Sequence, residues 1–361
     1  MRARPVSRPG SGLAPGPAPR RGTALARGLA LRLAATVPAL FGVLALCFAL
    51  MRLLPGDPAS LIASSPGGDA AERAAIRAQL GLDAPLPAQF AGYLGSLARG
   101  DLGRSLLTGQ PVSADIAARL PASLELTLCG FALALLVALP CGLLAARWPG
   151  GPLDHLLRLV AALGAALPSF VTGLLLILVF YHLLGWAPDP TGRFDVFAAP
   201  PAPRTGLALV DTLLAGDAAA FRDAASRLVL PSLTMALFVA APLMRVTRAA
   251  LIAVFDSGYM LNARALGLTR RQRLWTWGVG TAAVPVLTVS ATLFAAMLGA
   301  SALVESVFAW PGIGRYAVEA FRAADFAAVQ GVVLTMAAVF VVLNLAVDLL
   351  ALLLDPRMLP A

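Results

Sequence analysis

Residues 126–146 read LTLCGFALALLVALPCGLLAA, a run of 21 residues without a single Asp, Glu, Lys or Arg. A helix that crosses the ~30 Å hydrocarbon core of a bilayer needs about 17–25 apolar residues, so this run alone can span a membrane. The whole 361-residue chain is 59% hydrophobic and only 13% charged, with a mean hydropathy of +0.80. Soluble globular proteins carry roughly 25% charged residues. The composition therefore predicts an all-α polytopic membrane protein and excludes a soluble enzyme.

Five other apolar runs are long enough to cross a bilayer, which brings the expected number of transmembrane helices to six. They cover residues 33–51, 159–188, 228–244, 274–304 and 326–347. The third and fifth of the six runs are too long for one perpendicular helix and too short for two helices with a turn, so we expect tilt or apolar flanks there. The first run is longer than the apolar core of a secretory signal and no small-residue cleavage site follows it, so we expect it to be retained.

All 28 basic residues are arginines, and their distribution predicts the orientation of the chain in the membrane. If the six runs are spans, one side of the membrane carries 16 arginines and three acidic residues, whereas the other side carries 11 arginines and 14 acidic residues. Basic residues accumulate in cytoplasmic segments. The arginine-rich side includes both termini and residues 147–158 and 245–273, and it is therefore expected to be cytoplasmic.

The same pattern divides the chain into five parts. These are a disordered cytoplasmic tail at 1–30, a first transmembrane helix at 31–54, a periplasmic loop at 55–120, a transmembrane core of five helices at 121–354 with its cytoplasmic loop at 245–273, and a cytoplasmic tail at 355–361. Disorder is expected in the first part because it is rich in Pro, Gly, Ala and Arg and has no apolar periodicity.

The residue inventory excludes several kinds of chemistry. Without lysine, the chain lacks the Gly-x-x-x-x-Gly-Lys-[Ser/Thr] loop that holds nucleotide phosphates, so ATP would have to be bound by another chain. The three cysteines lie in apolar runs and the two histidines are far apart, which predicts no disulfide framework, metal site or cofactor. No catalytic triad or pair of catalytic acids is recognisable, so we expect no enzyme. We assign the net charge of +9 to membrane topology and not to nucleic acid.

The polar segment 245–273 carries the most information about function. Residues 259–266 have helix-forming content, Gly267 ends this helix, and Thr269 can cap the next one, which continues into the fifth run. Small residues such as Ala263 and Ala265 would let a partner approach closely, while arginines could meet carboxylates of that partner. The segment could equally be a lipid-facing basic loop that only obeys the topology rule.

The fifth run and the residues after it contain two further patterns. Ala291, Ala295 and Gly299 recur every four residues, a spacing that allows close helix packing in a bundle interior or at a dimer seam. An acidic residue, Glu305, then precedes an aromatic-Pro-Gly turn that includes Trp310. This second pattern fits a re-entrant or interfacial element, or a simple outer loop.

Seven motifs in this order resemble the permease subunit of the dipeptide, oligopeptide and nickel class of bacterial ABC importers. They are Pro55-Gly56-Asp57-Pro58; Leu80-Gly81-Leu82-Asp83 with Pro85 and Pro87; Gly100-Asp101-Leu102-Gly103; Leu120-Pro121 with Leu124-Glu125-Leu126; Ala263-Arg264-Ala265-x-Gly267; Glu305-x-x-Phe308-x-Trp310-Pro311-Gly312-x-Gly314; and Asn344, Asp348 and Asp355-Pro356-Arg357. The first three are typical of the first of the two permease types in such systems.

The resemblance implies the transmembrane fold of a type I ABC importer in the bacterial inner membrane. It implies a second homologous permease, two ATPase subunits and a periplasmic solute-binding protein as partners, within the lipid bilayer. It also implies that a coupling helix contacts the ATPase through Asn262, Ala263, Arg264, Ala265 and Gly267. A secondary transporter or channel that needs no ATPase is the alternative; it would show inverted repeats and polar groups in mid-span, and neither is evident. Peptides, nickel chelates, glutathione and glycosides all remain possible solutes, and the solute-binding residues are unknown.

Overall fold

The computed structural model of the chain describes residues 37–38, 40–50 and 83–354, with side chains described up to residue 346. In this part of the chain the secondary structure is helical, apart from one β-bridge between Arg104 and Pro111. The expected all-α class is thereby confirmed for the described residues. The proposed tails and residues 55–82 of the predicted periplasmic loop lie outside them.

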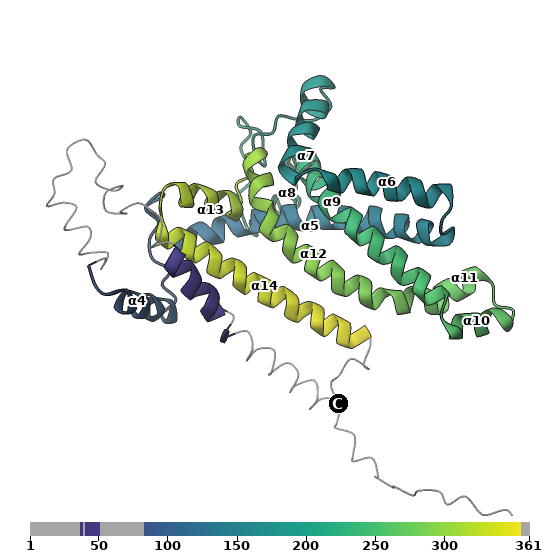
Figure 1. Cartoon of the computed structure of the whole chain (residues 1–361). Coiled ribbons are helices and arrows are strands. Elements are labelled where there is room, and N and C mark those ends of the chain that lie inside the picture. The colour runs from purple at the N-terminus through teal and green to yellow at the C-terminus, as the bar shows by residue number, and fades with distance from the viewer. Residues whose placement is uncertain (1–36, 39, 51–82, 355–361) are drawn as a thin grey trace, which may run out of the picture.

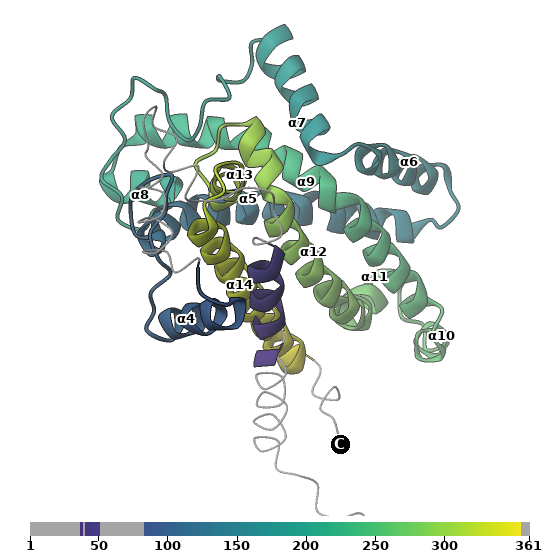
Figure 2. The same ribbon diagram turned by 60° about the vertical axis from the view of Figure 1, so that its left-hand side comes forward.

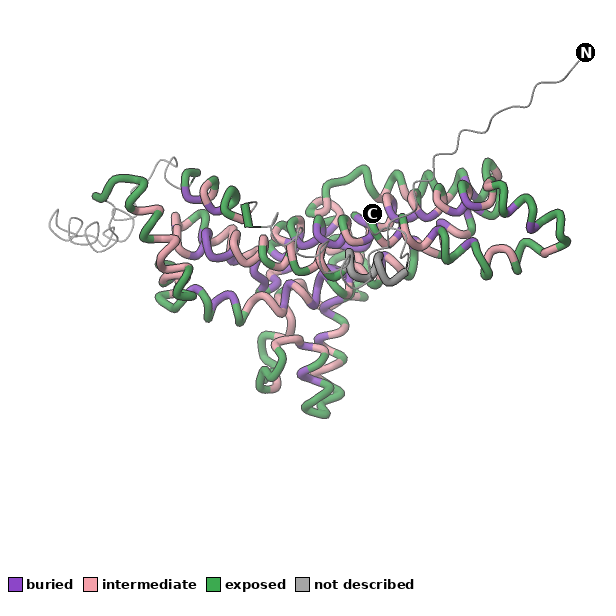
Figure 3. Tube along the Cα trace, turned by 90° about the horizontal axis from the view of Figure 1, so that it is seen from below, coloured by how far each residue is buried: buried purple, intermediate pink, exposed green. Residues whose placement is uncertain are grey.

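Four long helices form the body of the molecule (Figure 1). They are α5 (Val112–Arg147), α9 (Ala218–Phe255), α12 (Val279–Val307) and α14 (Phe326–Leu354). Helices α5 and α9 pack along each other at the centre, α12 lies against both, and α14 lies against α12 and α5. Each of the four includes a segment long and apolar enough to cross a membrane. Buried positions follow these central helices, while the helix ends are exposed (Figure 3).

Two glycines allow the close approach of α5 and α9. A Cβ atom on Gly130 would lie 2.7 Å from the Cβ of Met235, and one on Gly142 would lie 2.7 Å from the Cβ of Thr247. Real Cβ atoms do not come this close, so neither position of α5 accepts a larger residue without a shift of α9. The hydrophobic core consists of apolar side chains from α5, α9 and α12 around this contact.

The third apolar run is not one tilted helix, which corrects the expectation from its length. It consists of α6 (Pro152–Ala166) and of α7 (Ser169–Leu176) with the π-helical η1 (Ile177–Leu183), and the two parts meet at 99°. The break falls at Leu167, whose φ of −95° and ψ of 141° are extended. Pro168 follows directly, and a proline disfavours the helical conformation of the residue before it. The pair forms at most one span, which gives five candidate spans in the described part.

The first predicted span is only partly described. Its described portion, Leu40–Leu50, is an apolar helix of 11 residues, too short by itself to cross a membrane. The expected six helices and the position of both termini therefore remain predictions.

The short elements gather at two opposite ends of the long helices (Figures 1 and 2). One end holds α4 (Leu86–Ala98), α8 (Ala208–Ala215) and α13 (Ile313–Arg322), and the other holds α10 (Gly258–Ala265), α11 (Arg270–Arg273), η2 (Leu274–Gly278) and the turn between α5 and α6. Residues 147–158 and 245–273, which charge counting assigned to the same side of the membrane, thus lie at the same end.

Candidate functional site

The connection between α9 and α12 (residues 256–278, called the α9–α12 connection below) begins with a tight turn. Helix α9 ends at Phe255, and Ser257 adopts an extended conformation with φ −70° and ψ 150°. The Ser257 hydroxyl donates to the carbonyl of Val254 (2.5 Å), and its own carbonyl accepts from the backbone N–H groups of Met260 and Leu261. These bonds satisfy backbone groups at both helix ends, so α10 has a fixed direction relative to α9.

Helix α10 ends where the sequence predicts. Gly267 has a left-handed φ of +83°, and the N–H of Leu268 donates to the carbonyl of Ala263 across the turn (3.2 Å). Thr269 then caps α11, and the side chain of Gln272 accepts from the Thr269 backbone N–H in a reciprocal capping box. Since only glycine adopts positive φ without strain, Gly267 sets the angle between the two short helices.

The predicted contact residues lie on two different faces of α10. Asn262, Arg264, Ala265 and Gly267 are exposed, whereas Ala263 is only 4% exposed. Ala263 faces the same way as the fully buried Met260, which packs in a small apolar cluster with Ala146, Leu251, Val254 and Ala282. The side chain of Ala263 therefore supports α10 from within the chain, and the other four residues remain available to a partner.

Two arginines hold the α9–α12 connection in place, one by a bond to α5 and one by a bond within the connection. The Nη2 of Arg270 donates to the carbonyl of Ala146 in the last turn of α5 (3.2 Å), and the Nη1 of Arg273 donates to the carbonyl of Met260 in α10 (3.4 Å). The Ala146 carbonyl lies near a helix C-terminus, where carbonyls have no partner within the helix and favour a positive charge. Helix α10 is thus bonded to the segment that begins with α11, this segment is bonded to α5, and Ser257 joins α10 to α9.

Three large apolar side chains on α10 and its end are exposed, and sequence reasoning did not single them out. Tyr259 is 47%, Leu261 is 56% and Leu266 is 75% exposed. They surround the exposed Asn262 and Ala265 and add apolar area to this face. In the sequence they are recognisable as large apolar residues in an otherwise arginine-rich connection. Such a pattern is typical of a contact surface.

The predicted packing row on α12 is only partly covered by the chain itself. Ala295 is buried and Ala291 is half-buried, but Gly299 is exposed, and a Cβ added to it would meet nothing within 4 Å. Helix α12 lies against α5, α7, α9 and α14. Ala291 and Ala295 therefore pack inside the chain, whereas Gly299, at the end of the row, remains uncovered.

At the opposite end of the molecule, a buried carboxylate holds the turn after α12. Glu305 is fully buried, and its side chain accepts from the hydroxyls of Ser123 (2.6 Å) and Ser301 (2.9 Å) and from the backbone N–H of Arg315 (2.8 Å). Arg315 lies in the first turn of α13, so the carboxylate satisfies one of the N–H groups that a helix start leaves free. This turn is a built junction of three helices, α5, α12 and α13.

Two glycines of the same turn are required by close contacts, Gly312 by this carboxylate and Gly314 by the backbone of α12. A Cβ on Gly312 would lie 2.4 Å from the Glu305 carboxyl group and 2.4 Å from the Ser123 hydroxyl, and one on Gly314 would lie 2.6 Å from the Cα of Ala302. Trp310 is 1% exposed, and its indole N–H donates to the carbonyl of Ala122 (2.9 Å). Trp310 therefore belongs to the interior of this junction.

A second buried carboxylate, Glu125, lies nearby on α5 and holds the start of α8. It accepts from the backbone N–H groups of Ala208 (3.0 Å) and Leu209 (2.8 Å) and pairs with Arg193 at 2.6 Å. The guanidinium of Arg193 lies 5.9 Å from the ring centroid of Trp310. The loop before α8 is thereby connected to the Glu305 junction.

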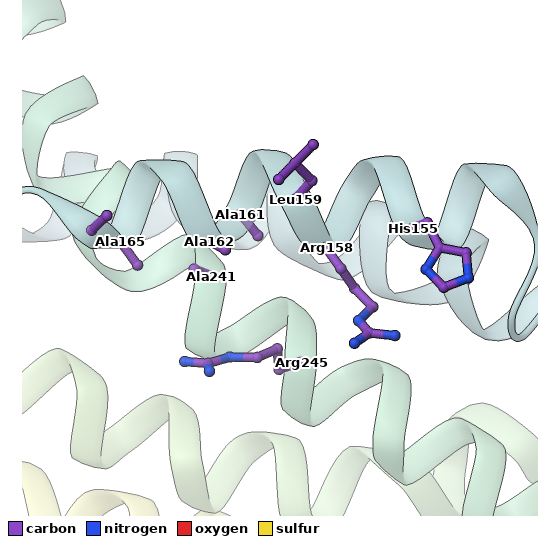
Figure 4. A pocket seen from close by; sticks show the side chains of 9 residues that line it. His155, Arg158, Leu159, Ala161, Ala162, Ala165, Ala241 and Arg245 are labelled. Carbon is purple, nitrogen blue, oxygen red and sulfur yellow. The ribbon is translucent and has the colours of Figure 1, made fainter.

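A basic groove of about 620 Å³ runs between α6 and α9 (Figure 4). Its walls are mostly alanine side chains, and Arg158 and Arg245 extend into it from the two helices. His155 lies near one end, and no acidic side chain lines the groove. Beside it, the fully buried Asp154 of α6 forms a two-point ion pair with Arg248 of α9, at 2.7 and 2.6 Å.

The molecule combines apolar helices of spanning length with a hydrogen-bonded helical connection at one end and a carboxylate-held junction at the other. These features define a multi-pass membrane protein. Two family models match the chain: "Binding-protein-dependent transport system inner membrane component" over residues 138–360, and the N-terminal membrane component of the same systems over residues 25–127. The chain belongs to this family of inner-membrane transport permeases, which confirms the resemblance drawn from its motifs.

Curated relatives of similar length support the assignment. The chain is 40% identical to a probable D,D-dipeptide transport system permease of Escherichia coli (strain K12), over 88% of this chain and 92% of that protein. It is 37% identical to a di/tripeptide transport system permease of Pseudomonas aeruginosa (strain UCBPP-PA14), over 91% and 97%. It is also 35% identical to a glutathione transport system permease of Escherichia coli (strain K12), over 90% and 96%.

Proposed function

We propose that the chain is the membrane subunit of an ATP-driven importer that carries peptides, or a related small solute, from the periplasm to the cytoplasm. Family membership and the peptide and glutathione transport named for its relatives support this function. The single observation that carries the coupling to an ATPase is the exposed face of α10 on a connection that hydrogen bonds fasten to α5, through Arg270, and to α9, through Ser257.

The proposal includes the partners and the arrangement in the membrane. A periplasmic binding protein delivers the solute, two ATPase subunits sit on the cytoplasmic side, and a second homologous permease completes the pathway. Six spans with both termini in the cytoplasm, and the five parts of the chain defined above, belong to the same proposal. Its support is the excess of arginine in segments that lie at one end of the structure.

In this mechanism α10 transmits the motion of the ATPase to the spans. Asn262, Arg264, Ala265 and Gly267 contact the ATPase, while Ala263 keeps α10 seated on the chain. Because Ser257 bonds the connection to α9, Arg270 bonds it to α5 and Arg273 bonds α10 within it, displacement of α10 moves α5 and α9 as a rigid group. ATP can shift the conformation only if the face of α10 binds one ATPase state more tightly than the other.

The test uses Gly267→Arg and Ala265→Asp, each of which adds a bulky or charged group to the exposed face. We expect normal membrane insertion but loss of both ATPase co-purification and peptide uptake. Gly216→Arg is the matched control: Gly216 also has positive φ (+69°) and open space around it, but it ends α8 at the opposite end. Normal uptake and normal co-purification in the Gly267 and Ala265 variants would disprove the coupling role.

The alternative, a transporter or channel that works without an ATPase, has a direct test. The purified chain alone in liposomes is expected to move no peptide down or up a gradient. Transport under these conditions would contradict the proposed mechanism even if the variants above behaved as expected.

A further inference from the structure

A second pocket, of about 370 Å³, lies where the end of α5 meets the start of the α11–η2 segment (Figure 1). Its lining combines basic and apolar side chains: Leu143, Leu144, Ala146, Arg147, Phe255, Arg270, Arg271, Leu274 and Trp275. None of the residues of α10 lines it. The pocket is therefore separate from the face that we assign to the ATPase.

The charge of this pocket is uncompensated within the described part of the chain. Three arginines line it, no acidic residue does, and none of the three forms an ion pair with a described residue. The neighbouring Arg273 adds a fourth positive charge. Arg270 bonds the carbonyl of Ala146 and lies over the ring of Phe255, but Arg147 and Arg271 donate to no described side chain or carbonyl. The Arg147 guanidinium lies over the ring of Trp148, 4.7 Å from its centroid, and this contact leaves its N–H donors unused. The donors of Arg147 and Arg271 are thus available to an anion.

The apolar part of the pocket belongs to membrane-spanning helices. Leu143 and Leu144 lie in the last turns of α5, and Leu274 and Trp275 lie in η2, just before α12. Three tryptophans flank this region and are largely exposed: Trp148 is 50%, Trp275 is 64% and Trp277 is 41% exposed. Exposed tryptophans near arginines mark the level at which a membrane protein meets the lipid headgroups.

We propose that this pocket binds an anionic phospholipid, whose phosphate lies between Arg147 and Arg271 and whose acyl chain follows Leu144 and Leu274. A phosphate group offers several acceptor oxygens to guanidinium donors, and an acyl chain matches the exposed Leu144 and the half-buried Leu274. An acidic surface of a protein partner would satisfy the arginines but not the apolar wall at membrane depth. Basic pockets between membrane helices are known binding sites for anionic headgroups.

The bound lipid would also act on the α9–α12 connection. Without an anion, Arg147 of α5 faces the like charges of Arg270, Arg271 and Arg273, which opposes the contact of Arg270 with α5. A phosphate between the two elements removes this repulsion. The lipid is therefore expected to hold α11, and with it α10, against α5.

The experiment uses the full-length chain purified in detergent, with retained lipid measured by native mass spectrometry and binding measured by titration. The probes are phosphatidylglycerol, cardiolipin, phosphatidylcholine and inorganic phosphate. The test variant is Arg147→Gln/Arg271→Gln, which keeps Arg270 and its bond to α5. The control variant is Arg222→Gln/Arg322→Gln, which removes the same charge from two exposed arginines of α9 and α13 outside the pocket.

We expect the wild type and the control to retain phosphatidylglycerol or cardiolipin, and the test variant to bind it about thirtyfold more weakly, since two arginines near a lipid surface are lost. Equal binding by the test and control variants would overturn the proposal. Displacement of the lipid by inorganic phosphate at similar concentration would show a free-anion site and also overturn it. If the test variant kept its lipid but lost the ATPase subunits, the pocket would belong to the protein partner and the proposal would be wrong.

Discussion

At the scale of single residues, the turn after α12 shows how a carboxylate and two glycines depend on one another. Glu305 has three hydrogen-bond donors around it, and a Cβ on Gly312 would overlap both its carboxyl group and the Ser123 hydroxyl that donates to it. A buried carboxylate is tolerated only when such donors surround it. The glycine is therefore required by space and not by backbone angle, since its φ of −94° is open to any residue.

Gly312→Ala tests this dependence. The added methyl group would overlap the Glu305 carboxyl group, so we expect a loss of about 1–3 kcal/mol in the free energy of unfolding. Gly280→Ala in α12 is the control, because a Cβ there meets nothing within 4 Å and alanine favours the helix. Thermal unfolding in detergent compares the two. A Gly312 variant as stable as the Gly280 variant would show that the junction adapts.

The α9–α12 connection was predictable at this scale and the Glu305 junction was not. Gly267 and Thr269 act on residues no more than a few positions away, so the ends of α10 and α11 can be read from local sequence. The bond between Ser123 and Glu305 joins residues 182 positions apart. A single amino-acid sequence carries no signal for a contact between two residues so far apart, nor for the inward orientation of Ala263.

At the scale of elements, acidic residues hold the starts of several helices at one end of the molecule. Glu125 binds the start of α8, Glu305 binds the start of α13, and Asp325 binds the N–H of Ala328 in the first turn of α14. Each helix start offers unpaired N–H groups and a positive dipole end. Two of these residues, Glu305 and Asp325, are among the acidic residues that charge counting predicts on the outer side.

Asp211 gives this arrangement a pH dependence. Burial alone would raise the pKa of its carboxyl group, but the N–H and hydroxyl of Thr205 and the N–H of Gly206 outweigh burial and lower the pKa below its ordinary value of 3.8. A lowered pKa stabilises the fold above the unfolded value and loses that effect as the pH falls through the folded value.

We therefore expect Asp211→Asn to be less stable than the wild type at about pH 6, and the difference to shrink as the pH falls toward about 3. Thermal unfolding of both proteins over this range measures the difference. A stability difference between the two proteins that stays constant down to the lowest pH would show that the side chain of Asp211 stabilises the fold by its shape and not by its charge.

The bend between α6 and α7 shows the limit of prediction from run length. Residues 159–188 contain one proline that could kink a span or break it, and length and composition are the same in both cases. The choice depends on what the two halves pack against. Helix α6 lies along α9, while α7 contacts both α9 and α12, and these contacts favour the 99° bend.

At the scale of the whole molecule, the ion pair of Asp154 with Arg248 holds the bent pair α6–α7 to the central helices. Asp154 is fully buried, and it also accepts from the N–H of Gly150 in the turn after α5 (2.9 Å). Three elements that meet the same end of the molecule, α5, α6 and α9, are thereby connected through one carboxylate.

A double-mutant cycle of Asp154→Asn and Arg248→Gln measures this connection. Each single change leaves the other group without its partner, so we expect each to lower the free energy of unfolding by about 3 kcal/mol. The double variant should lose clearly less than the sum, because no unpaired charge remains. Additive losses in chemical unfolding would show that the pair does not act as a unit.

The interior position of Trp310 separates it optically from the other indoles of the chain. Trp148, Trp186, Trp275 and Trp277 are 41–74% exposed, while Trp310 is 1% exposed. Quenchers in the lipid or in water reach those four and leave the emission of Trp310. Light from the protected indole thus reports on the junction of α5, α12 and α13 without any attached dye.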